Sequence, residues 1–276
     1  MSSSTERSRA AGTDQADRSA VSTGSYVYGI VPVDVEIDDA RGVGDPPGQV
    51  KLIRHNEIAA LVSEVATNRP LGKPQDLKAH QQLLDAAAAE VPVLPLRFGA
   101  VMASEESVVD ELLAPHHDAF LAGLKELEGR AEYVIKGRYV ERAILAEVLA
   151  ENSEAAGLRE EIVGKPEDAT WDARIRLGEV INQSVEAKRD ADTQAMIEAL
   201  VPRCVAIAVR EPTHEQDAVH LAVLVETGQQ DELEQALDEF AGQWEGRVDL
   251  RLIGPLAAYD FVMTPQQEQE GNDPWT

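Results

Sequence analysis

The segment Val91-Pro-Val-Leu-Pro-Leu-Arg-Phe-Gly99 interrupts the helical pattern of the first half of the chain. It cannot form the interior of a helix, because each proline removes a backbone donor and clashes with the preceding turn. We therefore predict an extended or edge segment that leads into Arg97-Phe98-Gly99. Arg97 could form an ion pair with a carboxylate or present its guanidinium group to a partner, and a structural ion pair is the favoured reading of the two.

Helices are predicted on both sides of this segment. Residues 76–89 place His80 on the apolar side of a helix, and the run of alanines there raises the helix propensity. Ser104 is suited to cap the next helix, whose apolar stripe continues to Leu127. Pro115 is expected to bend or divide that second helix.

Strands are predicted outside the two helices. The β-rich run Tyr26–Val31 ends at Pro32, and the apolar runs Val50–Ile53 and Ile58–Val62 are close enough to form a hairpin. Residues 132–136 form a further strand after the second helix. The first half of the chain is therefore predicted to be a small sheet with helices.

The second half begins with a long, charged and mostly helical stretch from Tyr139 to Leu200. Gly157, Gly164 and Pro166 punctuate it, and we predict a linker there. The apolar side chains that follow are spaced as in one long helix with a single buried stripe: Trp171, Ile175, Ile181, Val185, Met196 and Leu200.

The remaining elements are two strands, a helix and a strand, at residues 204–209, 218–225, 229–240 and 247–253. After a long helix, this order is typical of an α+β unit. We predict an α+β protein of two domains. The predicted divisions are a disordered N-terminal arm (1–24), an N-terminal α+β domain (25–138), a helical segment plus C-terminal α+β domain with a small antiparallel sheet (139–263), and an acidic tail (264–276).

The charge of the chain argues against several classes of partner. It carries 50 acidic and 25 basic residues, a formal net charge of −25. Such a field repels phosphate backbones and anionic membranes, so we expect neither a nucleic acid nor a membrane as partner. No N-terminal apolar run suits a signal peptide, and no stretch approaches the roughly 20 apolar residues that span a bilayer. We therefore expect a soluble, cytoplasmic protein.

The residues also argue against catalysis, metal binding and cofactor binding. Cys204 is the single cysteine, and its apolar surroundings predict a buried, unreactive thiol. His116 and His117 are adjacent on a helix and so point in different directions, which does not favour a metal site. Gly42-Val-Gly44 lies in a proline-rich loop and not between a strand and a helix, which removes its meaning as a dinucleotide motif.

A family resemblance is carried by several segments, in one order along residues 25–262. The chain resembles the GvpL/GvpF family of gas vesicle proteins, and Val91–Gly99 is the most specific match. One departure is visible, since the family tends to continue its last segment as G-P-L-P-P-Y-S-F and this chain has Ala257-Ala258 and Asp260. The matching residues are Tyr26–Ile30, Ala60–Glu64, His80, Val91–Gly99, Gly254–Leu256, Tyr259 and Phe261-Val262.

The resemblance implies two α+β domains, of which the first is a modified ferredoxin-like fold. It implies a role in gas vesicle formation, through contact with the major shell protein GvpA and with other accessory proteins, and it implies no enzymatic activity and no cofactor. Localisation would be cytoplasmic, at the gas vesicle. The distinctive Pro, Gly, Arg and aromatic positions are the candidate partner contacts: Leu96, Arg97, Phe98, Gly99, Gly254, Pro255, Tyr259 and Phe261.

Two alternatives remain open from the sequence. The chain could be a small-molecule enzyme on a ferredoxin-like fold that uses Arg97 or His80, and a pocket of convergent polar groups would distinguish it. It could instead be an acidic domain that binds a regulator, and a salt dependence of folding would distinguish that.

Overall fold

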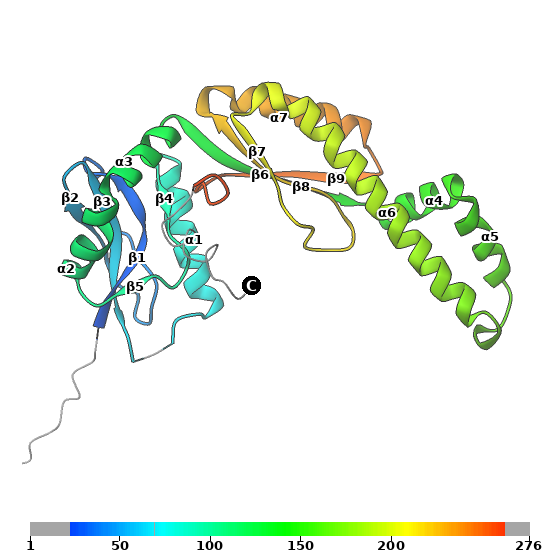
Figure 1. The fold of residues 1–276 in the computed structure, drawn as a ribbon, viewed down its shortest axis with the longest axis horizontal. Helices are drawn as coiled ribbons and strands as arrows, with labels where there is room; N and C mark the ends of the chain where they lie inside the picture. Colours follow the sequence, from blue (N-terminus) through cyan, green and yellow to red (C-terminus); the bar gives the residue numbers. More distant parts are fainter. Residues whose placement is uncertain (1–22, 69, 263–276) are drawn as a thin grey trace, which may run out of the picture.

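The computed structural model describes residues 23–68 and 70–262. The predicted arm (1–24) and tail (264–276) lie outside the described residues, except for residues 23 and 24, which begin the first strand. The chain forms a five-stranded and a four-stranded sheet, each accompanied by helices (Figure 1). The predicted α+β class with two sheet-plus-helix units is confirmed.

The first sheet has the strand order β2-β3-β1-β4, and β5 also pairs with β1. The predicted hairpin between β2 and β3 is confirmed, and its turn holds Asn56 at a φ of 51°, a left-handed conformation that Asn tolerates better than most residues. β1 is central and almost entirely buried, as expected for a strand covered on both faces. The strands are β1 (Thr23–Pro32), β2 (Val50–His55), β3 (Ile58–Ala66), β4 (Leu94–Pro95) and β5 (Val101–Met102).

Helices cover both faces of the first sheet. One face packs against α1 (Pro74–Ala88), and the other against the continuous helical run α2 (Glu105–Ser107), η1 (Val108–Leu113) and α3 (Ala114–Leu127). The hydroxyl of Ser104 accepts a hydrogen bond from the Ser107 N–H at 3.2 Å, which confirms the predicted N-cap.

Pro115 does not divide this run, which continues without a gap from Glu105 to Leu127. In the π-helical turn η1 the Ala114 N–H reaches back five residues to the Val109 carbonyl, and Pro115 then stands in the first turn of α3. A proline is tolerated there because its missing N–H would have no helical partner.

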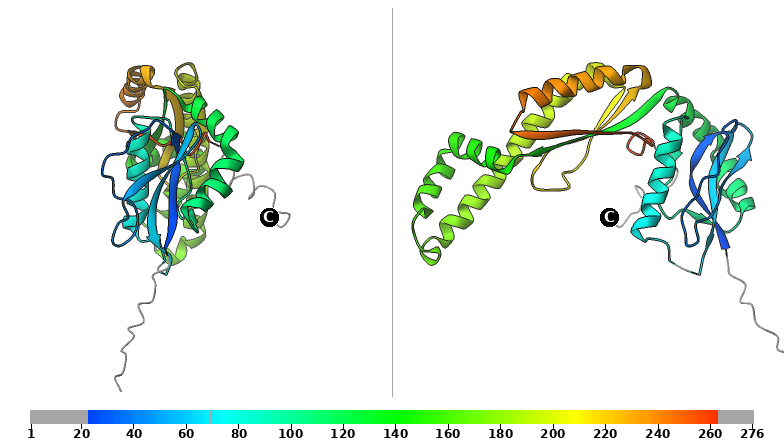
Figure 2. Two further views of the ribbon diagram at one scale, coloured as in Figure 1. Left: turned by 90° about the vertical axis from the view of Figure 1, so that its left-hand side faces the viewer. Right: turned by 180° about the vertical axis from the view of Figure 1, so that it is seen from behind.

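The second sheet is antiparallel, with the order β7-β8-β6-β9. Helices α6 (Trp171–Leu200) and α7 (Gln230–Gln243) lie on one of its faces, as Figures 1 and 2 show. Strand, helix, two strands, helix and strand in this order form a ferredoxin-like arrangement. The strands are β6 (Arg130–Tyr139), β7 (Ala206–Val209), β8 (Asp217–Glu226) and β9 (Val248–Leu256).

Strand β6 belongs to the second sheet, between β8 and β9. A division of the chain at residues 138 and 139 would separate β6 from both of these neighbours. The pairing is invisible locally because β6 directly follows α3, whereas its partners lie far along the chain. The domain boundaries themselves stay a prediction.

Helices α4 (Glu141–Glu151), α5 (Ser153–Ile162) and the first half of α6 form an arm that projects beyond the second sheet (Figure 1). In the region predicted as a linker, Gly157 lies within α5, and Gly164 and Pro166 lie in the turn between α5 and α6.

The long helix α6 is confirmed, but the prediction of a single buried stripe along it is wrong. Met196 and Leu200 are fully buried against the sheet, whereas Trp171 is 61% exposed and Ile175 49% exposed. The reason is geometric, since α6 is longer than the sheet and its first half extends past the strands (Figure 1).

Candidate functional site

The predicted partner contacts lie in two segments rich in Pro and Gly, a first at residues 91–99 and a second at residues 254–262. These two Pro/Gly segments meet in the structure. Val93 and Phe98 of the first segment and Ala257 and Tyr259 of the second belong to one apolar cluster on the α1 side of the first sheet. Segments more than 150 residues apart in sequence therefore form one junction between the two units.

His80 of α1 is the polar centre of this junction. Its Nδ1 lies 2.9 Å from the Tyr26 hydroxyl, and its Nε2 lies 3.0 Å from the Tyr259 hydroxyl. The Tyr26 oxygen also accepts a hydrogen bond from the Gly99 N–H at 3.0 Å, and the Phe98 ring packs edge-on against the His80 ring. One imidazole thus connects β1, α1, the segment after β4 and the segment after β9.

Burial keeps this centre uncharged. His80 is 1% exposed, and burial lowers its pKa from 6.5 to about 4, so the imidazole is neutral near pH 7. Burial also raises the pKa of Tyr26 and of Tyr259. A general base works best with a pKa near the operating pH, and His80 is far from that condition.

The second segment also contacts both units, through α1 of the first and β6 of the second. The Ala257 N–H donates to the Asp85 carboxylate of α1 at 3.1 Å. Gly254 has a φ of 149°, and a Cβ there would lie 2.6 Å from the Tyr133 ring, so no side chain fits. The following peptide, Gly254–Pro255, is cis.

An ionic cluster around the buried Glu132 fixes the segment to the second sheet. Glu132 of β6 is 1% exposed, accepts a hydrogen bond from the Asp260 N–H at 3.1 Å and pairs with Arg210 at 3.0 Å. Arg210 pairs with Asp260 as well. Burial and the neighbouring Asp260 raise the pKa of the Glu132 carboxyl.

The exposure of the eight predicted contact residues differs. Leu96 is buried, and Phe98, Pro255, Tyr259 and Phe261 are half-buried. Arg97, Gly99 and Gly254 are exposed. Most of these positions therefore serve the junction itself, and contact with a partner stays a prediction for all eight.

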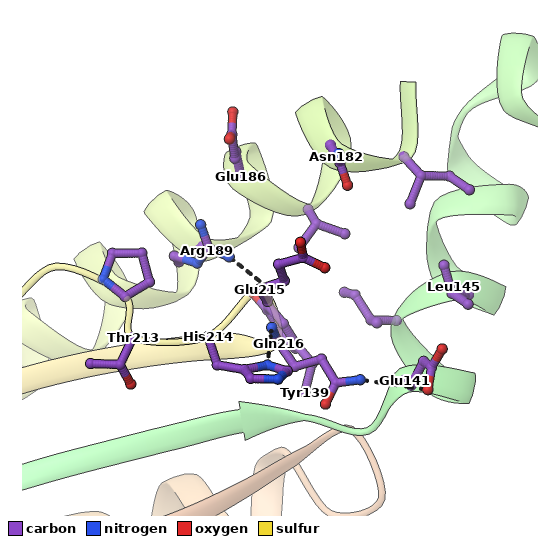
Figure 3. A pocket seen from close by; sticks show the side chains of 14 residues that line it. Tyr139, Glu141, Leu145, Asn182, Glu186, Arg189, Thr213, His214, Glu215 and Gln216 are labelled. Carbon is purple, nitrogen blue, oxygen red and sulfur yellow. Dashed lines mark hydrogen bonds between the residues drawn. The ribbon is translucent and has the colours of Figure 1, made fainter. Parts of the chain in front are cut away.

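A cleft that the sequence did not reveal lies at the base of the arm, between α4, α6 and the loop before β8 (Figure 3). Its volume is about 510 Å³. Apolar side chains of both helices line it, among them Ile144, Ile181 and Val185, and three glutamates stand around it: Glu141, Glu186 and Glu215.

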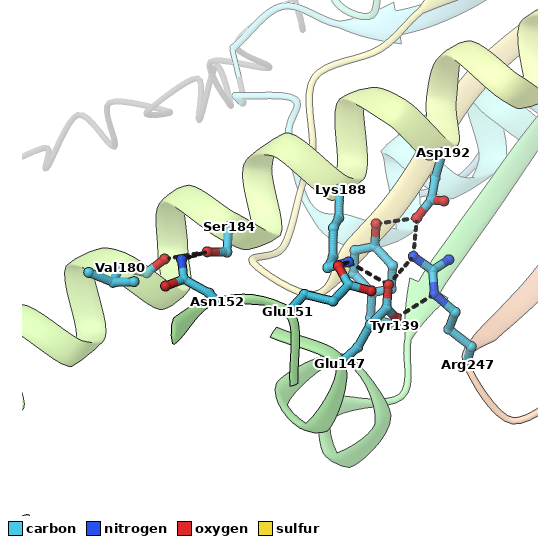
Figure 4. A network of polar contacts seen from close by, with 9 residues as sticks. All are labelled: Tyr139, Glu147, Glu151, Asn152, Val180, Ser184, Lys188, Asp192 and Arg247. Atoms are coloured by element: carbon cyan, nitrogen blue, oxygen red, sulfur yellow. Dashed lines mark hydrogen bonds and ion pairs between the residues drawn. The ribbon is translucent and has the colours of Figure 1, made fainter. Parts of the chain in front are cut away.

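A polar network joins the arm to the second sheet (Figure 4). Arg247, which precedes β9, pairs with Glu147 of α4 at 2.7 Å and with Asp192 of α6 at 2.8 Å. Asp192 also accepts a hydrogen bond from the Tyr139 hydroxyl at 2.6 Å, and Lys188 pairs with Glu147 at 2.5 Å. These partly buried contacts hold the arm in a defined direction.

The remaining groups considered in the sequence are the single thiol and the side chains that could bind a metal ion. Cys204 is half-buried just before β7, and burial raises the pKa of its thiol to about 11. Across residues 23–68 and 70–262, no cluster of His, Cys, Asp and Glu side chains is arranged to hold a metal ion. Within the same ranges, none of the helices combines the length and apolar character that crossing a bilayer requires.

The fold and the junction define a class of protein: two α+β units, tied by a C-terminal segment that returns to the first helix. Two solved structures share this architecture over nearly their whole length. The crystal structure of GvpF from Anabaena sp. PCC7120 aligns with a TM-score of 0.72 and 24% identity, covering 88% of this chain and 99% of that one. GvpF from Microcystis aeruginosa aligns with a TM-score of 0.70 and 22% identity, covering 87% and 99%.

The sequence comparisons give the family. The profile of the gas vesicle synthesis protein GvpL/GvpF family matches residues 24–263. Gas vesicle protein F of Streptomyces sp. (strain CB03234) is 33% identical over 243 residues, which cover 86% of this chain and 99% of the relative. Gas vesicle protein L of the same strain is 27% identical over 274 residues. The chain belongs to the GvpL/GvpF family, and the family resemblance predicted from the sequence is confirmed.

Proposed function

We propose that this chain is an accessory or minor structural protein of the gas vesicle that binds the major shell protein GvpA and assists nucleation and assembly, without catalysing a reaction. The observation that carries the proposal is the match to a gas vesicle synthesis family over residues 24–263, nearly the whole described chain. The neutral, buried His80 and the half-buried Cys204, whose thiol pKa is raised by burial, support a non-catalytic role.

The physical basis of the proposal is the solubility of the partner. A shell protein exposes large apolar faces before it assembles, and such faces aggregate in water. A chain with a formal net charge of −25 that covers these faces keeps the complex in solution, because the complex inherits its charge.

The surface of this chain that contacts the shell protein is proposed to include Arg97 and Phe98, which we call the rim of the junction. Arg97 is exposed and Phe98 is half-buried, so a cationic and an aromatic side chain follow one another at this rim. The buried residues of the junction, such as Leu96 and His80, hold this rim in place.

The test is capture of the shell protein from cells that co-express GvpA with the tagged chain. Capture by the wild type that is weakened by Arg97→Ala or Phe98→Ala supports both the function and the contact. Arg142→Ala is the matched control, since Arg142 is an exposed arginine on α4, which belongs to the arm and not to the junction. Capture that all three variants leave unchanged removes the rim from the proposal, and absence of capture removes the GvpA contact.

A further inference from the structure

The face of α6 that packs on the second sheet continues past the end of the sheet. From Met196 and Leu200 the same face runs back through Asn182, Ile175 and Trp171, at spacings of four, seven and fourteen residues that align side chains on a helix. Met196 and Leu200 are fully buried, whereas Trp171 is 61% and Ile175 49% exposed. One half of this face is therefore a largely apolar surface that no element within residues 23–68 and 70–262 covers.

The cleft at the base of the arm adjoins this exposed face. Val185 of α6 lines the cleft, one turn beyond Asn182, which also borders it (Figure 3). From Trp171 to Val185 is 14 residues of helix, a length of about 21 Å. We call the exposed face and the cleft together the arm groove, defined by Trp171, Ile175, Asn182 and Val185. Its length suits a polypeptide segment better than a small molecule.

An acidic edge runs along the arm groove. Asp172, Glu179, Glu186 and Asp190 follow one another at intervals of seven, seven and four residues, which places them on one side of α6, next to the apolar face. All four are exposed. Glu179 pairs with Arg176 at 3.3 Å, and within the described part of the chain no ion pair engages the other three.

Carboxylates also stand at the cleft end of the groove. Glu141 and Glu215 border the cleft together with Glu186 (Figure 3). Among the described residues only Glu179 of these carboxylates is in an ion pair, and an apolar strip flanked by such carboxylates is complementary to an apolar segment flanked by lysine or arginine.

We propose that the arm groove binds an amphipathic helix of another protein, one with an apolar stripe and basic flanks. Its apolar side chains pack on Trp171 and Ile175 and enter the cleft, and its basic side chains face the acidic edge. A second copy of this chain is a poor occupant, because two acidic edges and two net charges of −25 would be brought together. The inference adds a surface and a partner chemistry to the proposed function, and its test does not involve GvpA, so either can fail without the other.

The test uses two fluorescent 15-residue helical peptides with the same leucine stripe, one flanked by lysines and one by glutamates. Fluorescence anisotropy at 150 mM salt measures their binding to the full chain. We expect the lysine peptide to bind at least tenfold more tightly than the glutamate peptide. The double substitution Trp171→Ala/Ile175→Ser is expected to weaken its binding at least tenfold.

Matched controls separate the groove from general attraction to an acidic protein. Val201→Ser removes another exposed apolar side chain, and Glu232→Gln removes a carboxylate on α7. Both are expected to leave binding unchanged, whereas Glu186→Gln is expected to weaken it about threefold. Equal effects of the groove and control variants, or equal binding of the two peptides, would overturn the proposal. Self-association of the wild type in sedimentation velocity, lost in the double variant, would identify a second copy as occupant and would also overturn it.

Discussion

The buried imidazole of His80 predicts a specific loss of stability in mild acid. The pKa of His80 is lowered to about 4 in the folded chain, against 6.5 when unfolded. Between these two values the unfolded state binds a proton that the folded state does not, so the free energy of unfolding falls as the pH falls below 6.5. From pH 7 to pH 5 this one group removes about 2 kcal/mol, since each pH interval below the unfolded pKa is worth about 1.4 kcal/mol.

Urea unfolding at the two pH values measures this effect against His80→Gln, which cannot titrate. The wild type is expected to lose about 2 kcal/mol more than the variant between pH 7 and pH 5. Carboxyl groups such as Glu132 and Asp85, whose pKa values burial raises, contribute equally to both proteins and cancel in the comparison. An NMR titration of the wild type gives the same answer without a variant. A His80 imidazole that titrates near pH 6.5, or equal losses in the two proteins, would refute the reasoning.

Three further predictions concern the core, the turn after β9 and the cysteine. Leu84→Ala empties a fully buried site on α1 and is expected to lower the free energy of unfolding in urea by about 2–5 kcal/mol; a loss below 1 kcal/mol would contradict the packing. Gly254→Ala forces a Cβ against the Tyr133 ring and is expected to lower the free energy of unfolding by about 1–3 kcal/mol. Gly228→Ala, which has open space around its Cβ, is expected to leave the free energy of unfolding nearly unchanged. Similar losses for both variants would argue against a steric clash at Gly254. Cys204 is expected to react with iodoacetamide at pH 8 about 100-fold more slowly in the folded chain than in urea, because burial raises the pKa of its thiol to about 11. Comparable reaction rates in the two states would mean that the fold does not protect the thiol.

The local elements of the fold were accessible from sequence because their signals are local. Alternating or continuous apolar runs predicted β1, β2 and β3, and the Ser104 cap began the following helix as expected. The pairing of strands that lie far apart along the chain could not be predicted from the sequence. The partners of β6 lie more than 75 residues further along the chain, and nothing near residue 130 distinguishes them.

The candidate site was predicted in part. The composition of both Pro/Gly segments marked them as unusual, but only the fold shows that they meet at His80. The sequence placed His80 on the apolar side of a helix, but a single sequence does not show that two tyrosine hydroxyls converge on its ring. The arm groove was hidden for the opposite reason, since helical periodicity predicted one buried stripe for α6 and cannot show where the sheet ends.

The most direct test of the proposed function is whether the purified chain keeps the shell protein in solution. GvpA diluted out of denaturant is followed by light scattering with and without an equimolar amount of this chain, with an unrelated protein of similar negative charge as the control. We expect scattering to fall strongly with this chain and not with the control, and a soluble complex of the two proteins to be recovered by gel filtration. Aggregation that proceeds equally in all three samples, with no complex recovered, would contradict it.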